Sequence, residues 1–228
     1  MALKLRKKRR PRSISASASL IPSTWPSGKQ PRAAPHPSAS KLDQPPLVLT
    51  VGHSTRAVKD FVALLLAHGV KQLIDVRTIP RSRHNPQFNL NRLPRPLEQA
   101  GIRYRHMAGL GGLRHARRNS INAGWRNASF RGFADYMQTP EFEKALDQLI
   151  HLAQKRPTAI MCAEALPWRC HRSLIGDALL VRGLRVEEIT SQKRTRPHTL
   201  NAWARVRGKQ LTYPANLEGT KAVARRSA

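Results

Sequence analysis

The sequence predicts an α/β domain, a mainly parallel five-stranded sheet with helices on both faces. Two observations lead to this prediction. Short aliphatic runs alternate with segments in which apolar residues recur at helical spacing, which is the pattern of βαβ units. Several of the short runs are apolar at nearly every position, as in strands that are covered on both faces. The 228 residues, of which 40% are hydrophobic, are enough for one such domain with tails.

The first half of the domain contains three expected strands. Leu47–Val51 is an aliphatic run that ends at Gly52. Apolar residues then recur at helical spacing over 57–68, and a second aliphatic run at 73–76 forms the next strand. After these we expect a Pro-, Arg- and Asn-rich loop over 77–91, a short helix over 94–100 that ends at Gly101, and a weaker strand over 102–104.

The second half begins with a long, glycine-rich loop over 107–131. Apolar spacing then predicts a helix over 133–154, interrupted near Pro140. A strand follows at 158–162, and a helix begins near Cys170 and ends at Gly183. The last strand covers 184–189, and apolar residues beyond it predict that part of the following segment packs back on the domain: Trp203, Val206, Leu211 and Tyr213.

Basic charge is concentrated at the two ends of the chain. The sequence holds 41 Lys and Arg against 13 Asp and Glu, a formal charge of +28. Residues 1–45 lack periodic apolar surface, so we predict a disordered basic leader. It fits a nucleic-acid-binding arm, an organellar transit peptide or an extension without function. Residues 46–214 form the single domain, with a C-terminal extension from about 191, and 215–228 form a disordered basic tail.

Composition excludes several classes of protein. No stretch approaches the roughly 18 apolar residues of a membrane helix, which excludes an integral membrane protein. Cys162 and Cys170 stand eight residues apart and cannot staple a secreted scaffold. We therefore expect a cytoplasmic protein with reduced thiols, or thiols with a chemical role. The glycines form no dinucleotide-binding or phosphate-loop motif.

Reactive residue types follow three of the expected strands. In an open parallel sheet, ligands bind outside the carboxyl ends of the strands, so residues at those ends converge even when they are far apart in sequence. His53 and Ser54 follow the first strand and Arg77 the second. Asp75, inside the second strand, would need a partner such as Arg77 if it is buried. The remaining candidates lie after the second and fourth strands, in the segments Pro80–Pro86, Cys162–Glu164 and Pro167–Arg172.

The two cysteines allow three interpretations. In the first, one is a nucleophile, and Cys170 is the better thiolate because it lies at a helix N-terminus next to His171 and Arg172. Because adjacent residues on a helix face different ways, His53 or His84 could replace His171 as its acid/base partner. In the second, Cys162, Cys170 and one or two histidines such as His171 bind zinc. In the third, both cysteines are small packing residues.

Arginines flank the same predicted cleft. Guanidinium groups match the geometry of phosphate and carboxylate, so an anionic ligand is expected, and a solvated basic surface is the alternative. The loop over 107–131 surrounds Trp125 with basic and amide groups, which suits a nucleotide or a single-stranded nucleic acid. The expected anion- and substrate-binding residues are Ser54, Arg56, Arg77, Arg81, Arg83, Asn85, Trp125, Arg169 and Arg172.

Several short motifs together resemble the bacterial family called domain of unknown function 488, over about residues 47–214. The resemblance implies an α/β domain in a bacterial cytoplasm, and it implies no particular activity. The motifs are Gly52-His-Ser-Thr55, Asp75-Val-Arg77 with Pro80, Asn85–Asn89, Leu110–Gly112, Phe130–Phe133, Tyr136-Met137, Cys162–Glu164 with Cys170-His-Arg172, Pro197-His198 and Tyr213-Pro214.

Two functional hypotheses follow. The first is an enzyme that acts on a nucleotide, a phosphorylated compound or a nucleic acid, as a thiol-dependent or metal-assisted hydrolase or transferase. The second is a non-catalytic nucleic-acid-binding module that uses the basic tails and the loop over 107–131. No cofactor is predicted except zinc as the alternative at the cysteines, and the oligomeric state is left open. The expected catalytic residues are Cys162, Glu164, Cys170, His171 and His53.

Overall fold

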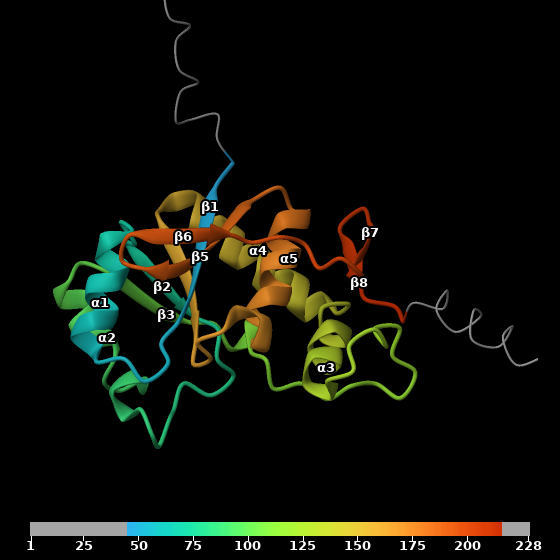
Figure 1. Ribbon diagram of the computed structural model, residues 1–228, viewed down its shortest axis with the longest axis horizontal. Helices are drawn as coiled ribbons and strands as arrows, with labels where there is room; N and C mark the ends of the chain where they lie inside the picture. The colour runs from blue at the N-terminus through green and yellow to red at the C-terminus, as the bar shows by residue number, and fades with distance from the viewer. Residues whose placement is uncertain (1–44, 216–228) are drawn as a thin grey trace, which may run out of the picture. The chain divides into compact units, whose positions relative to one another are not determined.

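The computed structural model describes residues 45–215, and a six-stranded sheet lies at the centre of this part of the chain (Figure 1). The strand order is β3-β2-β4-β1-β5-β6. The first five strands in chain order are parallel to their neighbours, and β6 is antiparallel to β5. The strands are β1 (Leu47–Gly52), β2 (Gln72–Asp75), β3 (Arg103–His106), β4 (Thr158–Cys162), β5 (Arg185–Ser191) and β6 (Arg194–Pro197).

Helices cover both faces of the sheet (Figure 1). The side chains of each strand alternate between the faces: Leu49 of β1 joins a core with α1 and α2, whereas Val48 joins a core with α3, α4 and α5. The helices are α1 (Val58–Ala67), α2 (Pro94–Gln99), α3 (Ala128–Tyr136), α4 (Pro140–Lys155) and α5 (Arg172–Val181), with short 3-10 turns η1 (Pro86–Phe88), η2 (Ala108–Leu110) and η3 (Pro167–Arg169).

The predicted fold class is confirmed, and the structure adds elements that the sequence pattern did not predict. These are the antiparallel strand β6 and a separate two-stranded sheet of β7 (Arg205–Arg207) and β8 (Gln210–Thr212). Pro140 does divide the predicted helix over 133–154, because it begins α4. The first part, α3, starts earlier than expected, since the side chain of Asn127 accepts hydrogen bonds from the backbone N–H groups of Ser129 and Phe130 and caps it.

The segment after β6 packs back against α5, as the apolar residues suggested. Leu211 and Tyr213 are buried, while Trp203 and Val206 stay exposed. Asp177, completely buried on α5, fixes this segment through hydrogen bonds from Tyr213, Asn201 and His198. The C-terminal segment is therefore held by a buried polar network as well as by apolar contact.

Some predictions cannot be compared with the structure. The expected leader and tail fall almost entirely on residues 1–44 and 216–228, which lie outside the described residues. Within 45–215, no helix is long and apolar enough to span a membrane.

Candidate functional site

An open cleft of about 1060 Å³ lies at the carboxyl ends of β1, β2 and β4. This is the edge at which the predicted residues were expected to meet. Gly52, the last residue of β1, allows the backbone at Glu164 to pack directly against the strand end, because a Cβ at position 52 would lie 2.0 Å from the backbone oxygen of Glu164. Predicted residues that line the cleft are His53, Ser54, Arg77, Arg81, Arg83, Asn85, Cys162, Glu164, Arg169, Cys170 and His171.

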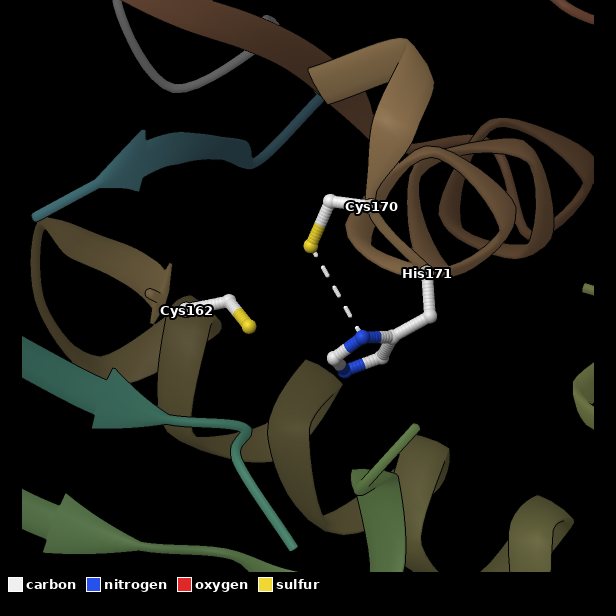
Figure 2. Close-up of side chains that lie close together, drawn as sticks. All are labelled: Cys162, Cys170 and His171. Carbon is white, nitrogen blue, oxygen red and sulfur yellow. Dashed lines mark hydrogen bonds between the residues drawn. The ribbon is translucent and has the colours of Figure 1, made fainter. Parts of the chain in front are cut away.

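Three of these residues form a compact group on the cleft wall. Figure 2 shows the side chains of Cys162 and Cys170 close together, with the ring of His171 beside both sulfur atoms. Ligand atoms of all three lie within 4.8 Å of one another. The sulfur of Cys170 lies 3.7 Å from Nδ1 of His171, and both cysteines are free thiols.

Cys170 and His171 can meet, although they are adjacent in sequence, because neither lies inside the helix. Cys170 has extended backbone angles of φ −132° and ψ 142° and follows η3. His171 is the N-cap of α5, which begins only at Arg172. The expected divergence of neighbouring helical side chains therefore does not apply here. His84, the alternative acid/base partner, is not among the residues that line this cleft in the described part of the chain.

The ring of His171 has a fixed orientation. Its Nε2 lies 2.9 Å from the carbonyl oxygen of Val76, which only accepts, so Nε2 carries the hydrogen. In the neutral ring, Nδ1 then presents its lone pair to Cys170. Phe133 packs edge-on against the ring, and Gly112 leaves room for it, since a Cβ at this position would lie 2.4 Å from Nδ1.

The two thiols have opposite pKa shifts. The hydrogen bond from Cys162 is the main cause that lowers the pKa of Cys170 well below its usual value, and His171 and Arg172 lower it further against the opposing effect of burial. The pKa of Cys162 is raised by the hydrogen bond to Cys170 and by burial. Of the two thiols, Cys170 is therefore the one that loses its proton more readily.

Arg172 supplies positive charge near the two cysteines and lowers the pKa of both. It is 2% exposed, and it donates to Oγ1 of Thr50 at 2.7 Å and to the backbone oxygen of Glu164 at 2.5 Å. No carboxylate of the described residues forms an ion pair with it. Because a buried charge needs compensation, the Cys170 thiolate is the anion that this arginine fits.

His53 and Arg77 form a second, rigid part of the wall. Asp75 is completely buried and accepts hydrogen bonds from the Arg77 side chain, so the expected pairing of these two residues is present. Burial lowers the pKa of His53 to about 4, which keeps the ring neutral. Its Nδ1 donates to the backbone oxygen of Ser54 at 2.7 Å, and the ring stacks on Phe88. These contacts leave His53 a weak candidate for proton transfer.

The outer part of the cleft is both basic and apolar. The side chains of Arg81, Arg83 and Arg169 line it and are exposed. Ile79 and Leu113 also line it, although they are 61% and 71% exposed. Sequence reasoning missed these two residues and Gly112. Each of the two aliphatic residues stands close to an arginine in the sequence, but an exposed aliphatic residue alone does not predict a binding surface. The two loops that carry them must first be known to face one another.

Three predicted site residues lie away from the cleft surface. Arg56 turns back and donates to the backbone oxygen of Gly52 at 2.6 Å. Trp125 packs on the rings of Phe130, Trp203 and Tyr213 instead of facing the cleft. Arg172 is buried and does not line it. The residues that remain can bind an anion next to a nucleophilic thiolate, and the group of Cys162, Cys170 and His171 could also hold a metal ion.

Comparison with known proteins gives one family match. The model of a family described as "Domain of unknown function DUF488" matches residues 57–179, a span that contains both cysteines, His171 and Arg172. No curated protein and no solved structure matches the chain.

Proposed function

The chain belongs to the family described as domain of unknown function 488, and from the chemistry of its cleft we propose that it is a thiol-dependent enzyme acting on an anionic substrate. Cys170 is the nucleophile. The observation that carries the proposal is the position of its sulfur, 3.7 Å from Nδ1 of His171 and within the electrostatic influence of Arg172, which is buried and has no acidic partner within residues 45–215.

His171 acts as the acid/base group. The hydrogen bond to Val76 leaves Nδ1 as the acceptor for the Cys170 proton. When the thiolate attacks, a covalent bond forms between the Cys170 sulfur and the electrophilic atom of the substrate, and the bond to the leaving group breaks. The proton held on Nδ1 then passes to the leaving group. Nucleophile, base and a carbonyl that orients the base are thus all present.

Arg172 and the N-terminus of α5 stabilise the thiolate. The helix begins two residues after Cys170, so its free N–H groups and dipole favour negative charge nearby. Arg172 adds a full positive charge in surroundings from which water is largely excluded, where an unpaired charge is costly. Together they favour ionisation of Cys170 before a substrate arrives.

The exposed arginines on the rim support an anionic substrate. Arg81, Arg83 and Arg169 flank the cleft, and each planar guanidinium group can donate two parallel hydrogen bonds to a phosphate or carboxylate. Ser54 and Asn85 line the same cleft and add neutral polar groups. A nucleotide, a phosphorylated compound or another small anion fits this chemistry.

Zinc at Cys162, Cys170 and His171 is the alternative for the same three residues. With the Cys170 proton held on His171, the thiol enzyme and the zinc site carry the same net charge, so metal content decides between them.

The nucleic-acid-binding alternative has less support. Trp125, the aromatic residue expected to stack on bases, is packed within an aromatic cluster. The loop around it is fastened to the domain, because Asp135 accepts hydrogen bonds from Arg117, Ser120 and Asn122. Reduced thiols are a requirement of the proposed chemistry, and a cytoplasm would provide them.

The test is the pH dependence of alkylation in variants that retain one cysteine. In Cys162→Ser, the hydroxyl can still donate to Cys170, and we expect iodoacetamide to modify Cys170 roughly 10-fold faster at neutral pH than a thiol of the unfolded chain, whose usual pKa is about 8.5. The rate should change little across the neutral range. In Cys170→Ser, the remaining Cys162 should react slowly, and faster only as the pH rises.

Metal content is measured on the same preparations. If Cys170 reacts no faster in the folded chain than in the unfolded chain, the thiol enzyme is wrong. If the wild-type chain retains one zinc ion through gel filtration and both thiols become reactive only after chelation, the three residues form a zinc site and the proposal of a thiol enzyme is wrong. Circular dichroism of both variants confirms that they are folded.

A further inference from the structure

Cys162 takes no part in the bond-making steps of the mechanism proposed above. A nucleophilic thiolate with its base needs only Cys170 and His171. Yet Cys162 also lines the cleft, is more exposed than Cys170, and has its sulfur within 4.8 Å of the Cys170 sulfur (Figure 2). A thiol in this position can reach any group that Cys170 has acquired.

We propose that Cys162 and Cys170 form a dithiol pair that reduces disulfides of anionic thiols, with Cys170 as the attacking thiolate and Cys162 as the resolving thiol. The inference rests on the proposed function, because it requires Cys170 to be the nucleophile. It adds the electrophile, a disulfide sulfur, and a role for Cys162.

The reaction balances in two exchange steps. The Cys170 thiolate attacks one sulfur of the substrate disulfide, a mixed disulfide forms, and the first substrate thiol leaves with the proton from His171. Cys162 then loses its proton to the neutral His171 and attacks the Cys170 sulfur, which breaks the mixed disulfide and releases the second substrate thiol with that proton. The substrate disulfide is reduced by two electrons and the protein is oxidised to a Cys162–Cys170 disulfide, which a cellular thiol reductant returns to two thiols.

The chain between the two cysteines suits this exchange. Cys162 ends β4, where its backbone oxygen accepts a hydrogen bond from the N–H of His53 at 3.0 Å. Cys170 follows η3 at the other end of a short connection, and only residues 163–169 separate them. Both sulfur atoms and Nδ1 of His171 lie within 4.8 Å, so one ring can serve both proton transfers. Attack within the chain is faster than attack by a free thiol, because the local concentration of Cys162 is high.

The rim of the cleft selects the substrate. Arg81, Arg83 and Arg169 provide for carboxylate or phosphate groups, and the exposed side chains of Ile79 and Leu113 provide an apolar surface between them. A small disulfide whose halves carry acidic groups matches both features.

The experiment uses the full chain, reduced and then freed of reductant and metal, with dithiobis(nitrobenzoate) as an anionic disulfide probe. The sequence contains two cysteines, so every product can be assigned by intact mass. We expect the wild type to release two nitrothiobenzoate anions per chain, retain no adduct and lose two hydrogens in mass. Cys162→Ser and Cys162→Ala should each release one anion and retain one adduct on Cys170. Cys170→Ser should react roughly 10-fold more slowly.

The outcomes separate the two proposals. If the wild type reacts rapidly at Cys170 but keeps two adducts, the dithiol inference is wrong and the nucleophile of the proposed function stands. If Cys170 reacts no faster than it does in urea, both fail.

A second measurement tests the charge of the substrate. The wild type should prefer the anionic probe over neutral dithiodipyridine at low salt, and Arg81→Gln with Arg169→Gln should reduce that preference severalfold. An unchanged preference would contradict the anionic class and leave the dithiol chemistry intact.

Discussion

Arg172 lies near the two cysteines with its guanidinium almost completely buried and without a carboxylate partner among the described residues. The sequence predicted an anion-binding role for this residue at the cleft surface. The structure instead buries its side chain, which does not line the cleft. The identity of neighbouring residues does not predict how deeply a side chain is buried, and burial is what distinguishes Arg172 from the exposed Arg169.

Replacement of Arg172 tests its influence on the thiolate. In Arg172→Met the pKa of Cys170 should rise toward the usual value of about 8.5, and alkylation at neutral pH should slow by roughly 10-fold. Arg172→Lys retains a charge and should be affected less. Arg169→Met is the control, because its exposed side chain is screened by solvent. Equal effects of Arg172→Met and Arg169→Met on the alkylation profile would contradict a specific role for the buried charge.

At the scale of elements, the junction between η3 and α5 determines the chemistry. The sequence pattern predicted that this helix starts near Cys170, whereas it starts two residues later, at Arg172. The later start makes His171, which was expected to face away, a possible partner of Cys170. Inside a helix, Cys170 and His171 would diverge, whereas with an extended Cys170 followed by His171 at the N-cap they converge. Helix starts are the least certain part of a pattern-based prediction, since fraying and capping decide them locally.

The loop after η2 is the second element on which the pair depends. In Gly112→Ala the new methyl would lie 2.4 Å from Nδ1 of His171, and the ring must move because Val76 and Phe133 hold its other sides. We expect Cys170 to lose most of its excess reactivity in the alkylation assay. Gly109→Ala is the matched control, since its methyl would meet only the Cβ of Ala145, at 3.0 Å. Unchanged reactivity in Gly112→Ala would show that the ring position does not matter.

At the scale of the molecule, the parallel sheet was predictable and its antiparallel additions were not. The buried aliphatic runs of β1, β2 and β4 follow directly from the sequence. β6 is Arg194-Thr-Arg-Pro197 and is mostly exposed, so it carries no apolar signal. Its edge position and its proline also suit a strand that must not pair further. The convergence of strand ends into one cleft was predicted from topology, but the depth of each arginine was not.

The buried network around Asp177 links the C-terminal segment to α5 and predicts a pH dependence of stability. Burial alone would lower the pKa of His198, but hydrogen bonds to Asp177 and Glu188 outweigh it and raise the pKa to about 9. This pKa is higher than that of the unfolded chain. The stabilisation is therefore complete below the ordinary pKa of about 6.5 and is lost as the pH rises through about 9.

His198→Gln tests this link. Its free energy of unfolding should fall below that of the wild type by about 1–2 kcal/mol in weakly acidic buffer, after solvent screening is allowed for. The difference should shrink as the pH rises through about 9. The measurement is urea denaturation of both chains at a series of pH values. Because the cysteines titrate in the same range, only the difference between the two chains is used. A difference that stays constant with pH would contradict a charged His198 in the folded state.

The central strand β1 is the first of the described strands to be synthesised, and both of its partners come late. Its two neighbours in the sheet are β4 and β5, which follow more than one hundred residues later in the chain, whereas β2 can pair with β3 much earlier. During synthesis, β1 therefore waits without a partner until most of the domain has left the ribosome. Cys162, Cys170 and Arg172 emerge in that same late stretch, so a nascent chain carries no activated thiol until the domain can close around it.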